Sequence, residues 1–325
     1  GRCPVQDAYG RTIRYLRISV TDRCNLRCRY CMPPSGMPEK LGHESILRNE
    51  EIVEVAKVAA GLGINKIRLT GGEPLVRKGI VELVAQLAAI PGIEDLAMTT
   101  NAVMLDTMAA PLKAAGLRRI NVSLDTLNPE RFKEMTRGGD LSRVLKGLEE
   151  AERVGIWPIR LNSVLIGGEN DSEIRDLAEL TRTKGYDVRF IELMPIGEAA
   201  TWTEEHFIST DHILEVLPEL VPDIAKAHDG PARYFRLPGA SGRIGLIQPV
   251  SCNFCADCDR IRLTADGKLK PCLHSDKEID LLAAIRAGED VAPIIQQAVG
   301  LKPERHHMEE SDYVPIVRGM YKIGG

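Results

Sequence analysis

Three cysteines near the start of the chain lie close enough together to bind one metal centre. Cys24, Cys28 and Cys31 are spaced C-x3-C-x2-C and follow a strand-like run at residues 15–20. A closed [4Fe–4S] electron carrier takes four thiolates, so three local ligands leave one iron open to an exogenous molecule. The alternative is a zinc knuckle or three incidental core thiols, although zinc pairs usually come as C-x2-C or C-x4-C with two further ligands.

A second group of cysteines lies in the last quarter of the chain. Cys252, Cys255, Cys258 and Cys272 are spaced C-x2-C-x2-C-x13-C. A β-hairpin predicted over residues 260–270, with Asp266 and Gly267 at its turn, brings Cys272 back beside the others. Four cysteines suit either a closed [4Fe–4S] cluster or a structural zinc site, and the residues alone leave both open.

Strands and helices alternate through the first 195 residues, with short connections marked by glycine. This alternation predicts a parallel sheet with helices outside it. Six such units favour a partial (β/α)6 TIM-type barrel; an open Rossmann-like sheet is the alternative, but no G-x-G-x-x-G follows the first strand. We expect a barrel domain over residues 1–195 and a smaller α+β domain over residues 196–325. The expected strands are 15–20, 66–70, 95–100, 119–124, 159–166 and 187–193.

Polar or distinctive residues recur where these strands end, which is the face of such a barrel that carries the chemistry. Any one of them alone is an ordinary strand-end residue, but their repeated placement on one rim favours a functional site. After the cysteine loop they are Gly71 to Pro74 (GGEP), Thr99 to Asn101, Ser123 to Asp125, Asn162 and Met194.

Arginines recur on the predicted strands and beside the second cysteine group. Arg68 stands between Ile67 and Leu69, an alternation that predicts one face turned into the barrel lumen. A cation there needs an anionic partner, and the planar guanidinium suits phosphate. The alternative is that these arginines are solvated or paired with carboxylates. The chain has no Walker-type phosphate loop. The set is Arg17, Arg68, Arg160, Arg260 and Arg262.

Composition limits the class of protein. The net charge of −4 argues against nonspecific nucleic-acid binding. No run of eighteen apolar residues exists, so no transmembrane helix is expected, and the first residues lack an apolar signal region. Seven of the eight cysteines form two tight groups rather than a disulfide framework, which indicates metal binding in a reducing compartment, and Cys3 is incidental. We expect a cytoplasmic protein, or a mitochondrial matrix protein if the source is eukaryotic.

The first cysteine loop, with aromatic Tyr30 before its last cysteine, resembles the radical S-adenosylmethionine (SAM) superfamily. The segment from Phe254 to Leu273 resembles the GTP 3′,8-cyclase family within it. The resemblance covers nearly the whole chain, through the segments GGEPLVR, TTN, NVSLDTL and IELMP and the terminal Gly324 and Gly325. It implies the partial barrel of the radical SAM type.

The resemblance implies two [4Fe–4S] clusters and SAM as cofactors. Cys24, Cys28 and Cys31 would hold the cluster whose open iron binds SAM. A second cluster would take three cysteines, with Cys252 outside the family pattern as a spectator or a fourth ligand; we favour the spectator. The second set is Cys255, Cys258 and Cys272, and the implied SAM contacts are Tyr30, Gly72, Ser123 and Met194.

The implied reaction is abstraction of the ribose 3′-hydrogen of GTP by a 5′-deoxyadenosyl radical, then closure onto guanine C8 to give 3′,8-cyclo-7,8-dihydro-GTP for molybdenum cofactor biosynthesis. Gly324 and Gly325 would reach the active site; a frayed tail is the alternative. Arg160 departs mildly from the family, where lysine is common. The implied GTP contacts are Arg17, Arg68, Thr99, Arg160, Arg260, Ile261 and Arg262.

The implied partners are GTP, an external electron donor and the next enzyme of the pathway. A homodimer is possible, and neither nucleic acid nor membrane is expected.

Two competing hypotheses use the same cysteines. A radical SAM enzyme acting on a peptide would not need the arginines or the terminal glycines. A non-catalytic electron carrier or zinc scaffold would have four-thiolate sites and would not cleave SAM.

Overall fold

The computed structural model describes residues 5–28, 42–194, 205–224, 232–248, 259–272 and 277–302. Their strands form one twelve-stranded sheet in the order β12-β11-β10-β1-β2-β3-β4-β5-β6-β9-β8-β7. The strands are β1 (Tyr15–Ser19), β2 (Lys66–Thr70), β3 (Asp95–Thr100), β4 (Arg119–Ser123), β5 (Ile159–Leu165), β6 (Asp187–Glu192), β7 (Val221–Pro222), β8 (Ala232–Arg236), β9 (Ile244–Ile247), β10 (Arg260–Leu263), β11 (Lys268–Lys270) and β12 (Ile279–Asp280).

The eight central strands, from β10 to β9, are all parallel, and an antiparallel pair completes each edge. The first six strands pair in sequence order, β1 to β6, each with the next. A connection between parallel neighbours must cross over the sheet, and here helices make the crossings. The predicted parallel sheet with strand–helix alternation is therefore confirmed.

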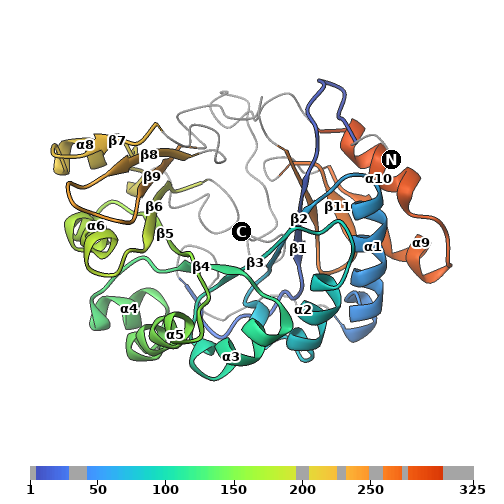
Figure 1. The fold of residues 1–325 in the computed structure, drawn as a ribbon, viewed down its shortest axis with the longest axis horizontal. Helices are drawn as coiled ribbons and strands as arrows, with labels where there is room; N and C mark the ends of the chain where they lie inside the picture. Colours follow the sequence, from blue (N-terminus) through green and yellow to red (C-terminus); the bar gives the residue numbers. More distant parts are fainter. Residues whose placement is uncertain are drawn as a thin grey trace.

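Helices cover the convex side of the curved sheet (Figure 1). Local sequence sets several ends: Asn128 caps α4 with Pro129 in its first turn, and Asp140 and left-handed Gly155 bound α5. The α-helices are α1 (Asn49–Gly61), α2 (Ile80–Ala88), α3 (Leu105–Ala115), α4 (Pro129–Met135), α5 (Leu141–Val154), α6 (Ile174–Thr183), α8 (His212–Val216), α9 (Leu282–Arg286) and α10 (Ala292–Gly300). The short 3₁₀ helices are η1 (His43–Ser45), η2 (Pro74–Val76) and η3 (Asp171–Glu173).

The two faces of the sheet differ in composition. Side chains alternate across a strand, so one set packs under the helices and the other faces the lumen. On β1, Leu16 and Ile18 belong to the hydrophobic core, whereas Tyr15 and Arg17 alternate with them. The same alternation places Arg68 of β2 and Asn121 of β4 on the lumen side. The lumen is therefore the polar side of the sheet.

Strands from the C-terminal part extend the barrel sheet at both edges. β9 pairs with β6 at one edge and β10 pairs with β1 at the other. The predicted hairpin is confirmed: β10 pairs antiparallel with β11, and Gly267 has φ +78° at the turn. Figure 1 shows β7 to β9 with α8 at one end of the curve, and β11 with α9 and α10 at the other. No helix among the described residues is long and apolar enough to cross a membrane.

Candidate functional site

The loop after β1 carries the first cysteines at the C-terminal end of the parallel strands. Cys24 and Cys28 are partly buried, and both pack against the hydrophobic core; Tyr30 and Cys31 lie outside the described residues. Burial raises the pKa of the Cys24 thiol to about 12, and the neighbouring Cys28 thiol acts in the same direction. A thiolate in such a place is stable only beside positive charge, and a metal centre supplies it. The two thiols therefore fit an iron–sulfur cluster.

The GGEP turn after β2 packs directly on the chain that leads into the cysteine loop. Gly72 N donates to Thr21 O at 3.0 Å and Glu73 N donates to Arg23 O at 2.7 Å. A Cβ on Gly71, whose φ is +148°, would lie 2.6 Å from Thr21 O, and one on Gly72 would collide with Arg23 O. These glycines are thus required by contact between two segments of the protein, in addition to any ligand contact.

Glu73 joins the GGEP turn to the end of β3. Its carboxylate accepts hydrogen bonds from Thr100 Oγ1 at 2.5 Å, Asn101 N at 2.7 Å and Leu75 N at 3.3 Å. Burial raises the pKa of Glu73 to about 7, although these three donors act against the rise. Asn101 in turn donates through Nδ2 to Asn25 Oδ1 at 2.7 Å, inside the cysteine loop. The first three strand ends therefore form one connected rim.

Three predicted site arginines stand side by side on the lumen face. In the strand register, Arg17 of β1 is opposite Arg262 of β10 on one side and Arg68 of β2 on the other. We call Arg17, Arg68 and Arg262 the arginine row. Burial and the charges of Arg262, Arg260 and Arg68 lower the pKa of Arg17 well below its usual value. Like charges on neighbouring strands are unfavourable, so the row fits an incoming polyanion.

Arg68 makes no ion pair with a carboxylate among the described residues. It is only 4% exposed, and its guanidinium donates to the Tyr15 hydroxyl at 2.5 Å and to Thr99 Oγ1 at 3.5 Å. With the Asn121 amide oriented so that its oxygen faces the arginines, that oxygen accepts from Arg68 Nη1 at 3.2 Å and from Arg189 Nη2 at 2.8 Å. Two hydroxyl oxygens and an amide oxygen, rather than a carboxylate, therefore hold Arg68 in place.

Arg160 has a different environment from the arginine row. Its Nε lies 3.4 Å from Asp187 Oδ2, and Arg243 Nη2 lies 3.6 Å from the same oxygen. We call Arg160, Asp187 and Arg243 the Asp187 cluster. Here pairing with a carboxylate, the alternative considered from the sequence, is what the structure contains. Arg160 can still reach an anion from the lumen face of β5, but its charge is already partly balanced.

The other predicted site residues differ in their exposure to solvent. Ser123 is exposed at the end of β4, and Met194 is partly buried after β6. Ile261 is 1% exposed within the hydrophobic core, so only its main chain can face the lumen. Arg260 lies with its guanidinium 5.5 Å over the Tyr15 ring. Asn162, predicted at the rim, accepts from Arg189 Nε at 2.9 Å. Sequence reasoning missed three lumen residues, although the strand alternation that selected Arg68 also applies to them: Tyr15, Asn121 and Arg189.

The second cysteine group is described only in part. Cys272 follows β11 and is partly buried, whereas Cys252, Cys255 and Cys258 lie outside the described residues, as do Gly324 and Gly325. Near Cys272, the buried Lys302 ammonium donates to Pro271 O at 3.0 Å and to Arg260 O at 2.9 Å. It ties the residue before Cys272 to the start of β10. The hairpin thus returns Cys272 toward the strand that begins just after Cys258.

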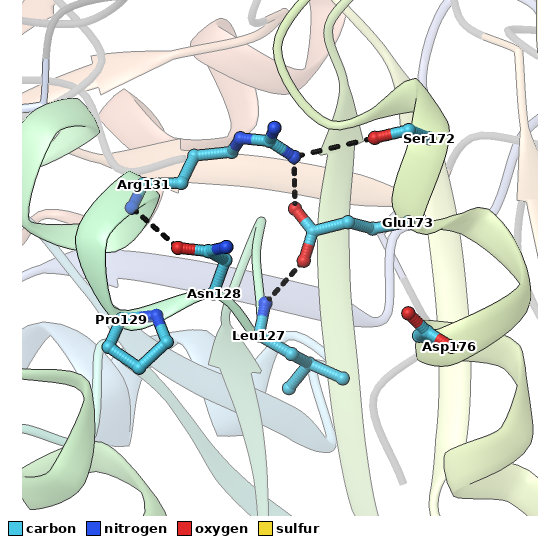
Figure 2. A pocket seen from close by; sticks show the side chains of 7 residues that line it. All are labelled: Leu127, Asn128, Pro129, Arg131, Ser172, Glu173 and Asp176. Carbon is cyan, nitrogen blue, oxygen red and sulfur yellow. Dashed lines mark hydrogen bonds and ion pairs between the residues drawn. The ribbon is translucent and has the colours of Figure 1, made fainter.

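A surface pocket lies among the loops after β4 and β5 (Figure 2), and none of its lining residues belongs to the arginine row. Its polar groups bind one another: Arg131 Nη1 donates to Glu173 Oε2 at 2.9 Å, Glu173 accepts from Leu127 N at 3.0 Å, and Asn128 caps α4. The pocket therefore has a structural explanation, namely the anchoring of α4 to η3.

Comparison with known proteins agrees with this arrangement. Residues 18–181 match the radical SAM superfamily, and residues 186–308 match a family described as Molybdenum Cofactor Synthesis C. The crystal structure of Streptococcus suis SuiB bound to S-adenosylmethionine has a TM-score of 0.65 at 14% identity, over 89% of this chain and 69% of that one. The curved parallel sheet is the fold of the radical SAM superfamily.

Relatives of known name are similar over almost the whole chain. A protein of Peptoclostridium acidaminophilum named GTP 3′,8-cyclase is 54% identical over 98% of each chain. One of Alkaliphilus oremlandii (strain OhILAs) with the same name is 52% identical over 99% of this chain and 100% of its own. The chain therefore belongs to the GTP 3′,8-cyclase family.

Proposed function

We propose that the protein cyclises GTP to 3′,8-cyclo-7,8-dihydro-GTP, the first step of molybdenum cofactor biosynthesis. Family membership supports the activity. The structural observation that carries the substrate assignment is the arginine row. Three guanidinium groups in register across β10, β1 and β2 create an unfavourable concentration of positive charge inside the barrel. A triphosphate relieves it by bringing several negative charges to bidentate donors.

The cofactors in this proposal are SAM and [4Fe–4S] clusters. Cys24, Cys28 and Cys31 would hold the cluster at the rim, with Tyr30, Gly72, Ser123 and Met194 around SAM. When bound, cluster and SAM supply an electron and a 5′-deoxyadenosyl radical. A second cluster would be held by Cys255, Cys258 and Cys272, with Cys252 as a spectator. The partly buried thiols of Cys24 and Cys28, and the hairpin that carries Cys272, support this assignment.

The chain's own residues bind and orient the substrate. Arg17, Arg68, Arg260 and Arg262 would hold the triphosphate, while Thr99, Arg160 and the main chain at Ile261 contact the nucleotide. This fixes the ribose relative to the rim that carries SAM, because the lumen residues and the cysteine loop belong to the same strands. Gly324 and Gly325 would reach into the active site, which must exclude water while the radical exists.

The wider setting follows from the same proposal. Residues 1–195 form the radical SAM domain, and residues 196–325 form the domain that carries the second cluster and the terminal glycines. An external electron donor would supply the electron that the cluster needs, and the next enzyme of the pathway would take the product. Whether the protein forms a homodimer is a question for experiment. The proposal includes neither nucleic acid nor membrane as a partner. It places the protein in the cytoplasm, or in the mitochondrial matrix of a eukaryote.

An anaerobic turnover experiment tests the proposal. The clusters are reconstituted and reduced, SAM is added, and 5′-deoxyadenosine is quantified with and without GTP while loss of GTP is followed. We expect GTP-dependent 5′-deoxyadenosine with matching GTP consumption. Cys24→Ala should abolish both. If 5′-deoxyadenosine forms at the same rate without GTP, and GTP stays intact, the substrate assignment is wrong and a peptide substrate becomes the better hypothesis.

A further inference from the structure

Tyr15, the first residue of β1, lies in the middle of the positive charges of the lumen. Its neighbours in the strand register are Lys66 of β2 and Arg260 of β10. Its hydroxyl oxygen lies 2.5 Å from Arg68 Nε, and the Arg260 guanidinium lies 5.5 Å over its ring. A guanidinium only donates, so the phenol oxygen must accept the hydrogen bond from Arg68.

The hydroxyl of Tyr15 donates to no protein acceptor among the described residues. A phenol that accepts from a cation and has no acceptor of its own is placed as an anion would be. The charged groups nearest to it on its own and adjoining strands are mostly positive. The positive groups are Arg17 of β1, Lys66 and Arg68 of β2, and Arg260 and Arg262 of β10. The two carboxylates are Asp259, which comes just before β10, and Asp95 of β3, which is ion-paired with Arg119.

We propose that Tyr15 is the internal counter-anion of the empty polyphosphate site and takes up a proton when the substrate's polyphosphate binds. This inference rests on the proposed function, because it needs a polyanion to enter the arginine row. The step is a protonation: the phenolate oxygen gains one proton from solvent. The negative charge that the phenol loses is replaced by that of the phosphates beside Arg17, Arg68 and Arg260.

The charge environment supports a phenol that ionises near neutral pH. Burial alone would raise the pKa of Tyr15, but the charges of Arg68, Arg17 and Arg260, with the hydrogen bond from Arg68, lower it to about 7. A bound polyphosphate neutralises the same arginines and repels a phenolate. The pKa of Tyr15 must therefore be higher in the complex than in the empty site.

The direction of the pH effect follows from this difference. The empty site loses the proton above pH 7, and the complex holds it, so binding takes up protons from solvent and the affinity for GTP falls as the pH rises. At pH 8 we expect uptake of up to about 0.9 proton per GTP bound, and above that pH a loss of up to about tenfold in affinity per unit. The γ-phosphate of GTP is almost fully ionised there, so it adds little.

Calorimetry on the anaerobic protein with its clusters tests the inference. GTP is titrated at pH 8 in two buffers of different ionisation enthalpy, and the difference in heat gives the number of protons taken up. The wild type, Tyr15→Phe and Tyr9→Phe are compared. Tyr15→Phe keeps the ring under Arg260 and removes only the hydroxyl. Tyr9, which is 55% exposed and near Arg11, is the matched control outside the lumen.

The expected result is proton uptake in the wild type and in Tyr9→Phe, and loss of that uptake in Tyr15→Phe with GTP still bound. GTP binding without proton uptake, or with the same uptake in Tyr15→Phe, overturns the role of Tyr15 and leaves the proposed function standing. Absence of GTP binding by the wild type at pH 7 and at pH 8 overturns the proposed function, and the inference with it.

Discussion

The arginine row and the Asp187 cluster show two ways in which one barrel holds buried arginines. In the Asp187 cluster, Arg160 and Arg243 share one carboxylate. In the arginine row, Arg17 lies between two further arginines, and Arg68 is held by a phenol, a threonine and an amide. Asp187 places a carboxylate beside two arginines, whereas the arginine row brings like charges together on neighbouring strands and so favours an added anion. We therefore expect the Asp187 cluster to stabilise the barrel and the arginine row to bind an anion.

Loss of the carboxylate that Arg160 and Arg243 share should lower the free energy of unfolding, and we expect this to be the largest effect of the substitutions considered. Asp187→Asn leaves two buried cations beside a neutral amide, and removal of one partner of a buried ion pair costs about 3–5 kcal/mol of unfolding free energy. Urea unfolding of the anaerobic protein measures it. Glu219→Gln, which breaks an exposed pair with Arg175, is the control and should leave the urea midpoint unchanged. Equal midpoints for the two variants would contradict this account of the Asp187 cluster.

Loss of one arginine from the row should instead impair binding. Arg68→Met keeps most of the buried volume and removes the charge. Because hydrogen bonds to charged groups contribute about 1.5–3 kcal/mol, we expect the dissociation constant of GTP to rise about 10- to 150-fold. The urea midpoint should stay near that of the wild type, since one of several like charges is gone. Arg153→Met on α5 is the control at an exposed ion pair. A fall in stability as large as that of Asp187→Asn would erase the distinction between the two groups.

An inorganic anion should stabilise the arginine row without any nucleoside. Inorganic triphosphate at ten times its dissociation constant should raise the unfolding free energy by about 1.4 kcal/mol, by mass action. The shift in urea midpoint should be present in Arg153→Met and much reduced in Arg68→Met at the same concentration. No shift in the wild type would mean that the row is not a polyphosphate site.

The smallest expected effect concerns the hydrogen bond between Arg68 and Thr99. At 3.5 Å it is at the limit for such a bond, so Thr99→Val should change the affinity for GTP by less than about 1 kcal/mol, or about fivefold. Calorimetry measures the change. A loss as large as that of Arg68→Met would show that Thr99 contributes to GTP binding far more than its weak hydrogen bond to Arg68 indicates.

The local pattern of the sequence predicted much of this molecule. Strand bounds such as those of β2 and β3 agree with the expected residues, and the turn at Asp266 and Gly267 gave the hairpin. The inward direction of Arg68 followed from simple alternation. Each of these features is set within a few residues of chain.

Contacts between distant strands could not be predicted in this way. The partner of Arg160 is Asp187 on the next strand, and a lone aspartate at a strand start carries no local signal for that pairing. Tyr15 likewise looks like an ordinary strand aromatic until β10 places Arg260 over its ring. The pairing of β10 with β1 joins residues about 245 apart, and no local periodicity encodes it.

That pairing has a consequence for biosynthesis on the ribosome. Both edges of the parallel sheet are completed late, β6 by β9 and β1 by β10. At about 5–20 residues per second, β1 waits roughly 12–50 s for its neighbour, with its backbone donors and acceptors open to other chains. We expect nascent chains stalled before β9 to recruit holding chaperones, and those stalled well beyond β10 to be released from them. Ribosome-bound chains of the two lengths, probed for chaperone occupancy, would show equal occupancy if late edge completion is unimportant.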